Sequence, residues 1–544
     1  MTLGRYVEGL VLIAVALVPM GAAALVWRKH LLPGWDGPVA RLAEIVLAVA
    51  SVIVLSEMLG SIHLFRLAAM APVLAVVGAI GWYTGKRRPD RASATEGRAG
   101  PPADATAEGP PPEGDSGPGR TSRGASLVAV IAVSVVAADW FTRTVDALHH
   151  GMTSTDTLWY HMPFAARFVQ QGSITPLHFV DSEAVTVFFP ASSELVHALG
   201  IMFMGNDLLS PLINLGWAAL ALLAGWCIGR PYGVAPVTIC GVAALLVTPG
   251  LVATQPGGAY DDIVGLALLL SCAALLVTAV QGAGSNRLAG QAFAALAAGL
   301  AMGTKFTFVA PVGALTVGIW VLARRGRRWS ETGIWLLLVV VTGGFWYLRN
   351  LIIVGSPLPS LHVKLGPISL PSPYVATPTS TVSHFLANGS AWRHYLLPGL
   401  RLSFGPVWWA VLGLSALGLI LGAATGPGRM PRMLAWVGIV SGAAFLVTPQ
   451  YLVVLGAPVF FVDNVRYGDP AAVLGLVLLP LVPVLRGRWP SWGLLGAYGG
   501  IVVLTQLDGT IWPTTILSQR FGFPIGGIDS LVGLLCGVAV LVVG

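Results

Sequence analysis

Residues 259–280 of the chain read AYDDIVGLALLLSCAALLVTAV. After Asp262 this stretch contains no charged residue. An apolar helix of about 20 residues matches the roughly 30 Å hydrocarbon core of a bilayer. The stretch therefore predicts a membrane-spanning helix that begins with two adjacent carboxylates, Asp261 and Asp262.

Similar apolar stretches recur along the whole chain. Of its 544 residues, 55% are hydrophobic and 10% are charged, and the mean hydropathy is +0.78. Soluble domains carry about 25% charged residues, so this composition excludes an ordinary soluble enzyme. It predicts an all-α polytopic membrane protein. About fifteen spans are expected from run length, near 6–27, 40–60, 67–84, 125–141, 209–229, 233–253, 259–280, 288–303, 306–323, 331–353, 404–424, 432–453, 467–485, 491–507 and 526–543.

One segment breaks the apolar pattern. Residues 86–124 are rich in Pro, Gly, Ala, Glu and Arg and contain no aromatic residue. Such a composition buries too little apolar surface to offset its ordering entropy. The segment is predicted to be a disordered cytoplasmic linker.

Basic residues predict the orientation of the spans. Lys and Arg gather in cytoplasmic connections of membrane proteins, and here they are Arg28, Lys29, Arg41, Lys86, Arg87, Arg88, Arg230, Arg287, Arg324, Arg325, Arg327, Arg328, Arg429, Arg432, Arg486 and Arg488. All of them can be cytoplasmic if 190–204 is an amphipathic helix on the outer surface. The connections 142–208, 254–258, 354–403, 454–466 and 508–525 then face outward.

Charge and cysteine content exclude two further classes. The formal net charge of +7 reflects these cytoplasmic connections, so a nucleic-acid partner is not expected. The four cysteines, Cys227, Cys240, Cys272 and Cys536, lie in or beside apolar spans without a CxxC pair. They are expected to be packing residues, and no metal cluster or disulfide framework is predicted.

The first candidate for chemistry is the segment TSTDTLWYHMP at 153–163. Asp156 stands where a helix N-cap would stand, so one interpretation is a cap alone. The other is a general base at the membrane surface that takes a proton from an acceptor hydroxyl.

Two further acidic segments follow. In FFPASSELVHAL at 188–199, Glu194 and His197 share one helix face; a solvated face is the simpler interpretation for His197. The pair Asp261 and Asp262 enters an apolar span, where acids are costly. Capping at the interface would explain this pair, although an ionisable residue at membrane depth is by default a functional candidate.

Three cations oppose the positive-inside bias. Lys305 follows Gly303-Thr304, Arg349 lies in WYLRN at 346–350, and Arg466 precedes Tyr467. An anion at the outer leaflet would explain them, and a lipid phosphate is the natural one. Nonspecific snorkelling to lipid headgroups is the alternative.

Together these segments resemble the GT-C glycosyltransferases, and within them the bacterial branch similar to protein mannosyltransferases and aminoarabinose transferases. The elements of the resemblance are Asp156 with Tyr160, His161 and Pro163; Pro190 with Glu194; Tyr260 with Asp262; Gly303-Thr304-Lys305; Trp346-Tyr347 with Arg349-Asn350; and Arg466-Tyr467. Their order carries the resemblance, which covers about residues 125–485. Residues 1–85 are then an added three-span module, and 486–544 are C-terminal spans.

The resemblance implies transfer of a sugar from a polyprenyl-phosphate carrier to an acceptor hydroxyl on the extracytoplasmic face of a bacterial plasma membrane. Asp156 would be the base. Lys305, Arg349, Arg466 and, secondarily, Arg167 would bind the carrier phosphate. Glu194, Asp262, Tyr160 and His161 would shape the substrate pocket. The acceptor would be a glycan, a lipid or a protein, and membrane lipids would be the other partners.

Thr155 and Thr157 flank Asp156, where relatives often carry an acidic pair. No metal is therefore predicted to be required, and no cofactor is expected. Two other functions stay open: a secondary transporter, whose charges would gather near the bilayer midplane on broken helices, and a non-catalytic membrane partner subunit.

Overall fold

The computed structural model describes residues 3–88, 123–180, 185–281, 286–361, 364–365, 368–372 and 379–507. The expected span at 526–543 and nearly all of the expected linker 86–124 lie outside the described residues.

Among the described residues, eight helices are long and apolar enough to cross a membrane. They are α1 (Leu3–Leu31), α2 (Gly37–Ser61), α3 (Leu67–Lys86), α5 (Arg123–His150), α8 (Ser210–Gly229, extended by the turn η3, Arg230–Tyr232), α11 (Asp262–Gln281), α19 (Trp408–Thr425) and α20 (Arg429–Val447). A ninth candidate is the pair of α14 (Arg328–Gly343, preceded by η5, Arg325–Arg327) and α15 (Phe345–Val354), bent by 71°.

Shorter elements complete the described chain. The remaining helices are α6 (Met162–Gln171), α7 (Ser192–Met204), α9 (Ala235–Leu246), α10 (Pro249–Thr254), α12 (Asn286–Thr304), α13 (Val309–Leu322), α16 (Val382–Phe385), α17 (Gly389–Ala391), α18 (Leu397–Phe404), α21 (Phe461–Asn464), α22 (Asp469–Leu478) and α23 (Arg488–Leu507). The single turns are η1 (Thr157–His161), η2 (Thr186–Phe188), η4 (Phe306–Phe308), η6 (Trp392–Leu396), η7 (Val465–Gly468), η8 (Leu479–Leu481) and η9 (Pro483–Leu485). Two antiparallel pairs of two-residue strands join β1 (Lys364–Leu365) to β2 (Ile368–Ser369) and β3 (Thr379–Ser380) to β4 (Gln450–Tyr451).

The prediction of an all-α, multi-pass membrane protein is confirmed, whereas the expected count of about fifteen spans is not. Proline accounts for part of the difference, because it lacks the N–H that continues a helix. The expected span 233–253 is divided into α9 and α10 just before Pro249. The expected span 467–485 contains a helix of 10 residues followed by turns at Pro480 and Pro483.

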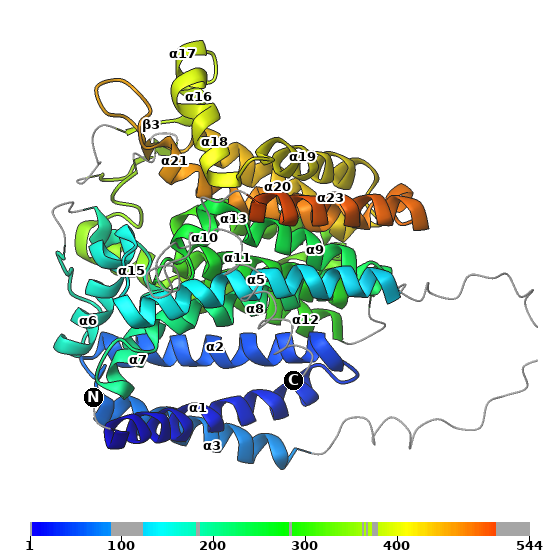
Figure 1. Ribbon diagram of the computed structural model, residues 1–544. Coiled ribbons are helices and arrows are strands. Elements are labelled where there is room, and N and C mark those ends of the chain that lie inside the picture. Colours follow the sequence, from blue (N-terminus) through cyan, green and yellow to red (C-terminus); the bar gives the residue numbers. More distant parts are fainter. Residues whose placement is uncertain are drawn as a thin grey trace, which may run out of the picture.

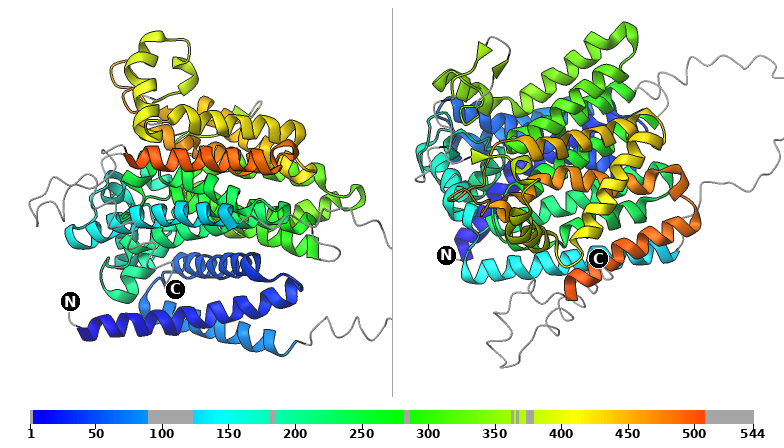
Figure 2. Two further views of the ribbon diagram at one scale, coloured as in Figure 1. Left: turned by 45° about the vertical axis from the view of Figure 1, so that its right-hand side comes forward. Right: turned by 90° about the horizontal axis from the view of Figure 1, so that it is seen from above.

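The long helices run side by side and are stacked in layers, from the α1–α3 pair up to α19 and α23 in Figure 1. Both this view and Figure 2 place α2 between the α1–α3 pair and the rest of the bundle. On its inner side, α2 contacts α7, α8, α11, α12 and α14. The boundaries expected for the added module and the catalytic core stay a prediction.

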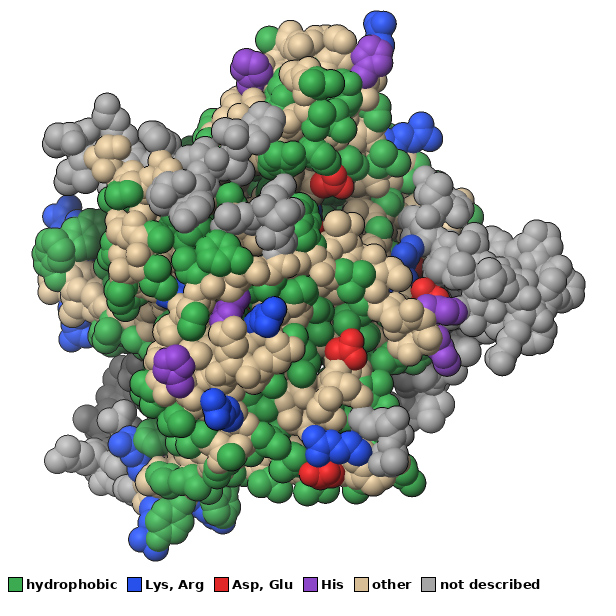
Figure 3. Space-filling view, turned by 90° about the vertical axis from the view of Figure 1, so that its left-hand side faces the viewer, with side chains coloured by type: hydrophobic (Ala, Val, Ile, Leu, Met, Phe, Trp, Pro, Cys, Tyr) green, Lys and Arg blue, Asp and Glu red, His purple; other side chains and the backbone are tan. Residues whose placement is uncertain are grey.

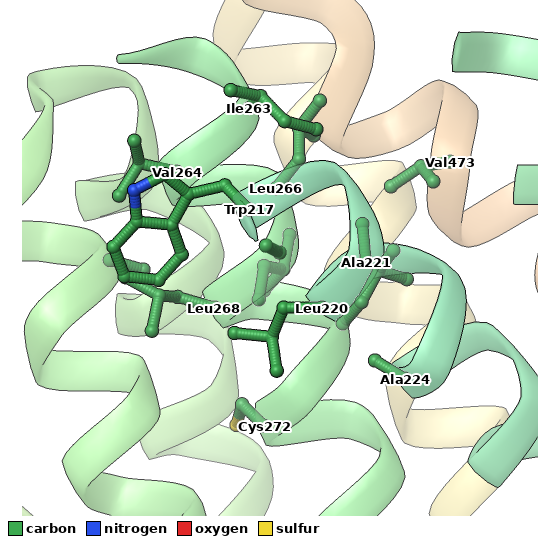
Figure 4. Packing of buried hydrophobic residues seen from close by; sticks show 14 of the residues in the cluster. Trp217, Leu220, Ala221, Ala224, Ile263, Val264, Leu266, Leu268, Cys272 and Val473 are labelled. Atoms are coloured by element: carbon green, nitrogen blue, oxygen red, sulfur yellow. The ribbon is translucent and has the colours of Figure 1, made fainter. Parts of the chain in front are cut away.

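The centre of the bundle is packed by small and branched side chains. Figure 4 shows Trp217 and Leu220 of α8 against Val264 and Leu268 of α11, with Val473 of α22 on the other side. Within the described chain, Cys227, Cys240 and Cys272 are buried with free thiols. Their predicted role as packing residues agrees with this burial; Cys536 lies outside the described residues.

Helix α7 corrects one expectation. The sequence predicts an amphipathic helix on the outer surface at 190–204, but nearly every side chain of α7 is buried. Helices α1, α2, α6, α8 and α12 surround it. The prediction of a solvated face for His197 is therefore wrong, since His197 is only 1% exposed. The apolar residues around Glu194 and His197 meet protein on every side, which the sequence of one helix does not reveal.

The connection between α2 and α3 is joined to the connection that follows α6. The Phe65 amide donates to the Gly172 carbonyl at 3.0 Å, and the Ile174 amide donates to the Gly60 carbonyl at 3.2 Å. Gly172 has a φ of +66°, which glycine adopts without strain. Residues 60–66 and 172–174 thus lie on the same side of the bundle, as the predicted orientation requires.

Candidate active site

Seven ionisable side chains from distant segments meet at the ends of helices. We call them the charged cluster: Asp156, His161, Glu194, Asp261, Asp262, Lys305 and Arg466. They lie toward the end of the bundle where Figure 1 shows α6, α7 and α15. Figure 3 looks onto that end and shows acidic, basic and histidine side chains scattered over a face of hydrophobic and other side chains. The cluster itself is mostly buried below such a surface.

Asp156 is held at the cluster by its neighbours in the first connection. The Thr157 hydroxyl accepts a hydrogen bond from the Ala259 amide at 2.8 Å, and the Asp156 amide donates to the Tyr260 hydroxyl at 3.1 Å. The Asp156 carboxylate makes no capping hydrogen bond to the turn that follows it. It instead accepts from the Arg466 guanidinium at 2.6 Å. The interpretation of Asp156 as a helix cap alone is therefore wrong.

A turn of π-helix, η1, follows Asp156 and leads into α6. Such turns are frequent at functional sites, and this one places Tyr160 and His161 on the buried side. His161 Nδ1 donates to Glu194 Oε1 at 2.5 Å, and both side chains are at most 2% exposed. Burial alone would lower the pKa of His161, but Asp261 and Glu194 raise it above its usual value. This pair therefore favours the protonated imidazolium.

The backbone before α11 is shaped by buried amides. Asn214 Nδ2 of α8 donates to the carbonyls of Gln255 at 2.8 Å and Tyr260 at 2.9 Å. Gln255 Nε2 donates to Asp262 at 3.1 Å, while its Oε1 accepts from the Ile263 amide. Gly257 has a φ of +70°, and a Cβ there would lie 2.8 Å from the Arg143 carbonyl oxygen. These contacts fix the backbone so that Asp261 and Asp262 face the other members of the charged cluster.

Lys305 lies between the two aspartates of α11. The residue has an extended backbone between α12 and η4, and this break in the helix turns its side chain inward. Its Nζ lies 2.7 Å from Asp261 and 2.6 Å from Asp262. Burial would lower the pKa of Lys305, but the two carboxylates raise it above its usual value. Burial raises the pKa of Asp261, and Lys305 and His161 only partly oppose that effect.

Arg466 connects the two halves of the cluster. In addition to Asp156, its guanidinium lies 3.7 Å from Asp262. It also lies over the rings of Tyr260 at 4.6 Å and Tyr467 at 5.4 Å. Such contacts stabilise a cation in a partly desolvated position. Arg466 and Asp156 are 14% and 13% exposed, so this edge of the cluster is accessible.

Tyr160 forms part of the wall beside these charges. Its ring centroid lies 4.2 Å from that of His161 and 5.8 Å from that of Phe189. Tyr160 is 8% exposed. The structure thus brings together Asp156, Glu194, Asp262, Tyr160, His161, Lys305 and Arg466 of the residues named from the sequence.

Arg349 and Arg167 do not join them. Arg349 donates to the Val187 carbonyl at 2.5 Å and to Asn350 at 3.0 Å, and it lies over the Trp346 ring. It thereby ties α15 to η2. Arg167 is exposed on α6 and its guanidinium lies 3.4 Å from Gln170. The carrier-phosphate role expected for these two arginines finds no support in their positions, because their contacts hold local structure.

Three members of the cluster also have the composition of a metal site. His161, Glu194 and Asp261 offer ligand atoms within 4.8 Å of one another. However, the Lys305 ammonium already lies 2.7 Å from Asp261 and places a positive charge beside these carboxylates. That no metal is required stays a prediction.

Sequence reasoning missed several residues. From the sequence, a role in the site was predicted for Asp262 but not for Asp261. Two adjacent acids at the start of an expected span would have marked both as candidate site residues. Asp469, buried at the start of α22, interacts electrostatically with Asp262, Arg466 and Lys305; an acid at the edge of an expected span could have marked it. Asn214 and Gln255 carry no such signal, because a single amide in an apolar segment has many explanations.

Comparisons with known proteins yield one structural similarity. No model of a known protein family matches the chain, and no curated protein matches it. Among solved structures, the crystal structure of ArnT from Cupriavidus metallidurans bound to undecaprenyl phosphate is similar over 76% of this chain and 70% of that chain. The TM-score is 0.46 and the sequence identity is 16%.

Proposed function

We propose that this protein is a GT-C-type glycosyltransferase that moves a sugar from a polyprenyl-phosphate carrier to an acceptor hydroxyl on the extracytoplasmic side of the membrane. The main support is a set of ion pairs between residues that lie far apart in the chain. Lys305 and Arg466 both lie beside the buried Asp262, and Arg466 also pairs with Asp156. A carboxylate and two cations at one membrane edge are what such a transfer needs.

The transfer develops negative charge on the carrier phosphate as the sugar leaves. Fixed cations in a partly desolvated site stabilise that charge more strongly than water does. Arg466 has the geometry for this role, since a guanidinium can contact a carboxylate and a phosphate at once. Lys305 already donates to two carboxylates. An ammonium has three donors, which leaves Lys305 one for a phosphate oxygen.

The acceptor hydroxyl must lose a proton during the attack. In our proposal the base is Asp156, whose Oδ2 is oriented by Arg466. Within the described chain this leaves Oδ1 for the acceptor. Glu194, His161, Asp262 and Tyr160 would line the sugar pocket. Hydrogen bonds hold the first three in place, and the Tyr160 ring packs against His161. A sugar offers hydroxyls as partners for such groups.

The position of the charges favours an enzyme over a transporter. Asp262 begins α11, Lys305 follows α12, and Arg466 precedes α22. Transporter sites gather near the bilayer midplane, whereas the sequence predicts these residues at the outer ends of the expected spans. In a non-catalytic partner subunit the Asp156–Arg466 pair would be a structural ion pair only, and replacing Asp156 would then change no transfer activity.

The test is sugar transfer by purified protein. A panel of radiolabelled undecaprenyl-phosphate and decaprenyl-phosphate sugars would be incubated with the protein and membrane extract, and the labelled product identified. We expect Asp156→Asn to lower turnover by about 10²–10⁴, the usual contribution of a general base, while binding of undecaprenyl phosphate is retained.

The matched control is Asp146→Asn. Asp146 lies on α5, where it pairs with His150 at 2.9 Å, and its amide variant should turn over like the wild type. Undiminished transfer by Asp156→Asn would remove Asp156 as the base. Absence of transfer with every donor would contradict the proposed function itself.

A further inference from the structure

We infer that Glu57 of α2, in the N-terminal three-helix segment, is a positioning residue for the Glu194–His161 pair. The inference rests on the proposed function for its catalytic consequence. Glu57 lies within a membrane-spanning helix and is 4% exposed. It lies near the end of this helix, Gly37–Ser61. An ionisable residue within a membrane-spanning segment is costly and is by default a functional candidate. Glu57 lies outside residues 125–485, the part of the chain that resembles the GT-C glycosyltransferases.

The contact that carries the inference is a hydrogen bond between helices. Ser192 at the start of α7 donates its hydroxyl proton to Glu57 Oε1 at 3.2 Å. The same hydroxyl oxygen accepts from the Trp346 indole of α15 at 3.0 Å. One serine thus joins α2, α7 and α15, and each of its partners has a consistent donor or acceptor role.

Helix α12 also packs against Ser192. A Cβ at Gly303 would lie 2.9 Å from the Ser192 hydroxyl, so α12 approaches closely just before Lys305. Tyr347 of α15 donates its hydroxyl to the Met302 carbonyl at 2.8 Å. The backbone that presents Lys305 is therefore packed against the serine that Glu57 holds.

Ser192 lies in the same helical turn as Glu194, a member of the charged cluster. Ser193 donates to Glu194 Oε2 at 2.9 Å, and Glu194 Oε1 accepts from His161. A shift at the start of α7 would move Glu194 away from the histidine. Because a displacement of about 1 Å can cost 10²-fold in rate, we expect loss of the Glu57–Ser192 contact to lower the rate of sugar transfer.

The experiment compares Glu57→Leu with Glu57→Gln in the full-length protein. The leucine cannot accept from Ser192, whereas the glutamine carbonyl can. We expect Glu57→Leu and Ser192→Ala to lower kcat about tenfold or more with little change in KM for the carrier-linked sugar. Glu57→Gln should retain most of the wild-type kcat.

The second measurement needs no activity. Hydrogen–deuterium exchange of the amides in residues 192–196 should become faster in Glu57→Leu and Ser192→Ala, and stay near the wild-type rate in Glu57→Gln. Glu44 provides the matched control, since it is also buried in α2 but pairs with Arg28 at 2.8 Å and Arg41 at 2.7 Å. Glu44→Leu should leave exchange in 192–196 unchanged.

Two exchange results would overturn the inference. One is unchanged exchange at 192–196 in Glu57→Leu; the other is an equal increase there in Glu44→Leu, which would indicate general loosening of α2. If the wild-type protein transfers no sugar, the proposed function fails, and the exchange data still decide whether Glu57 positions α7. Wild-type kcat in a correctly folded Glu57→Leu protein would also contradict a positioning role.

Discussion

Lys305 shows how one residue decides the charge state of the candidate site. Its ammonium lies within 2.7 Å of two adjacent buried carboxylates, Asp261 and Asp262. Both carboxylates are 3% exposed, and a buried charge without a partner is costly. The lysine therefore has a structural role in addition to the phosphate contact proposed for it, and the two roles can be separated by substitution.

We predict that Lys305→Met lowers the thermal unfolding temperature of the purified protein. Removing one partner of a buried ion pair costs about 3–5 kcal/mol, because a charge is left uncompensated. The double variant Lys305→Met/Asp261→Asn should recover part of the loss, since it also removes one of the carboxylates. Intrinsic fluorescence during heating in detergent would measure both. An unfolding temperature equal to that of the wild type in the single variant would contradict this account.

At the scale of elements, the cluster depends on irregular backbone between helices. The π-helical turn η1 aims His161 inward, and the connection between α10 and α11 aims Asp261 and Asp262. Asn214 of α8 is the main support of that connection, through its hydrogen bonds to the carbonyls of Gln255 and Tyr260. The long helices are the rigid frame against which these short segments are fixed.

We predict that Asn214→Leu destabilises this connection more than the remainder of the bundle. The substitution leaves two buried carbonyl groups without their donor, and each such group costs about 1–3 kcal/mol. Hydrogen–deuterium exchange should increase in 255–263 and stay unchanged in α19 and α20. As a control, Asn388→Leu removes the cap of the distant α17 and should leave exchange in 255–263 at the wild-type rate. Equal exchange in both variants would refute the supporting role of Asn214.

At the scale of the whole molecule, the cluster predicts how stability depends on pH. The folded state raises the pKa of His161 above its ordinary value of about 6.5, because Asp261 and Glu194 outweigh burial. The stabilisation is thus complete below that ordinary value, where the unfolded chain also carries the charge. It is lost as the pH rises through the raised folded value.

We therefore predict that the difference in unfolding temperature between the wild type and His161→Gln is largest below about pH 6.5. It should shrink as the pH rises above that value. Thermal unfolding of both proteins across this range would measure the difference, in which the contributions of titrating groups remote from His161 cancel. Asp261 and Glu194, which contact His161, titrate together with it. A difference that grows with pH would mean that the imidazole is held neutral.

The sequence by itself determined the class of this protein. Apolar runs of bilayer length specify membrane helices because backbone polar groups have no partner in lipid except one another. The sequence also identified Lys305 and Arg466 as candidates, because they oppose the positive-inside bias, and Asp156, because it lies in a polar outer connection. It also identified the acidic pair of α11.

Only the tertiary structure decided which of these candidates meet. Arg349 and Arg466 both looked like outer-leaflet cations, yet Arg349 ties α15 to η2 while Arg466 pairs with Asp156. Helix α7 reads as a surface helix until α1, α2 and α6 cover it. Burial and pairing depend on which helices become neighbours, and that is set by packing among segments hundreds of residues apart. The residue pattern of one segment therefore does not indicate which other segments it will pack against.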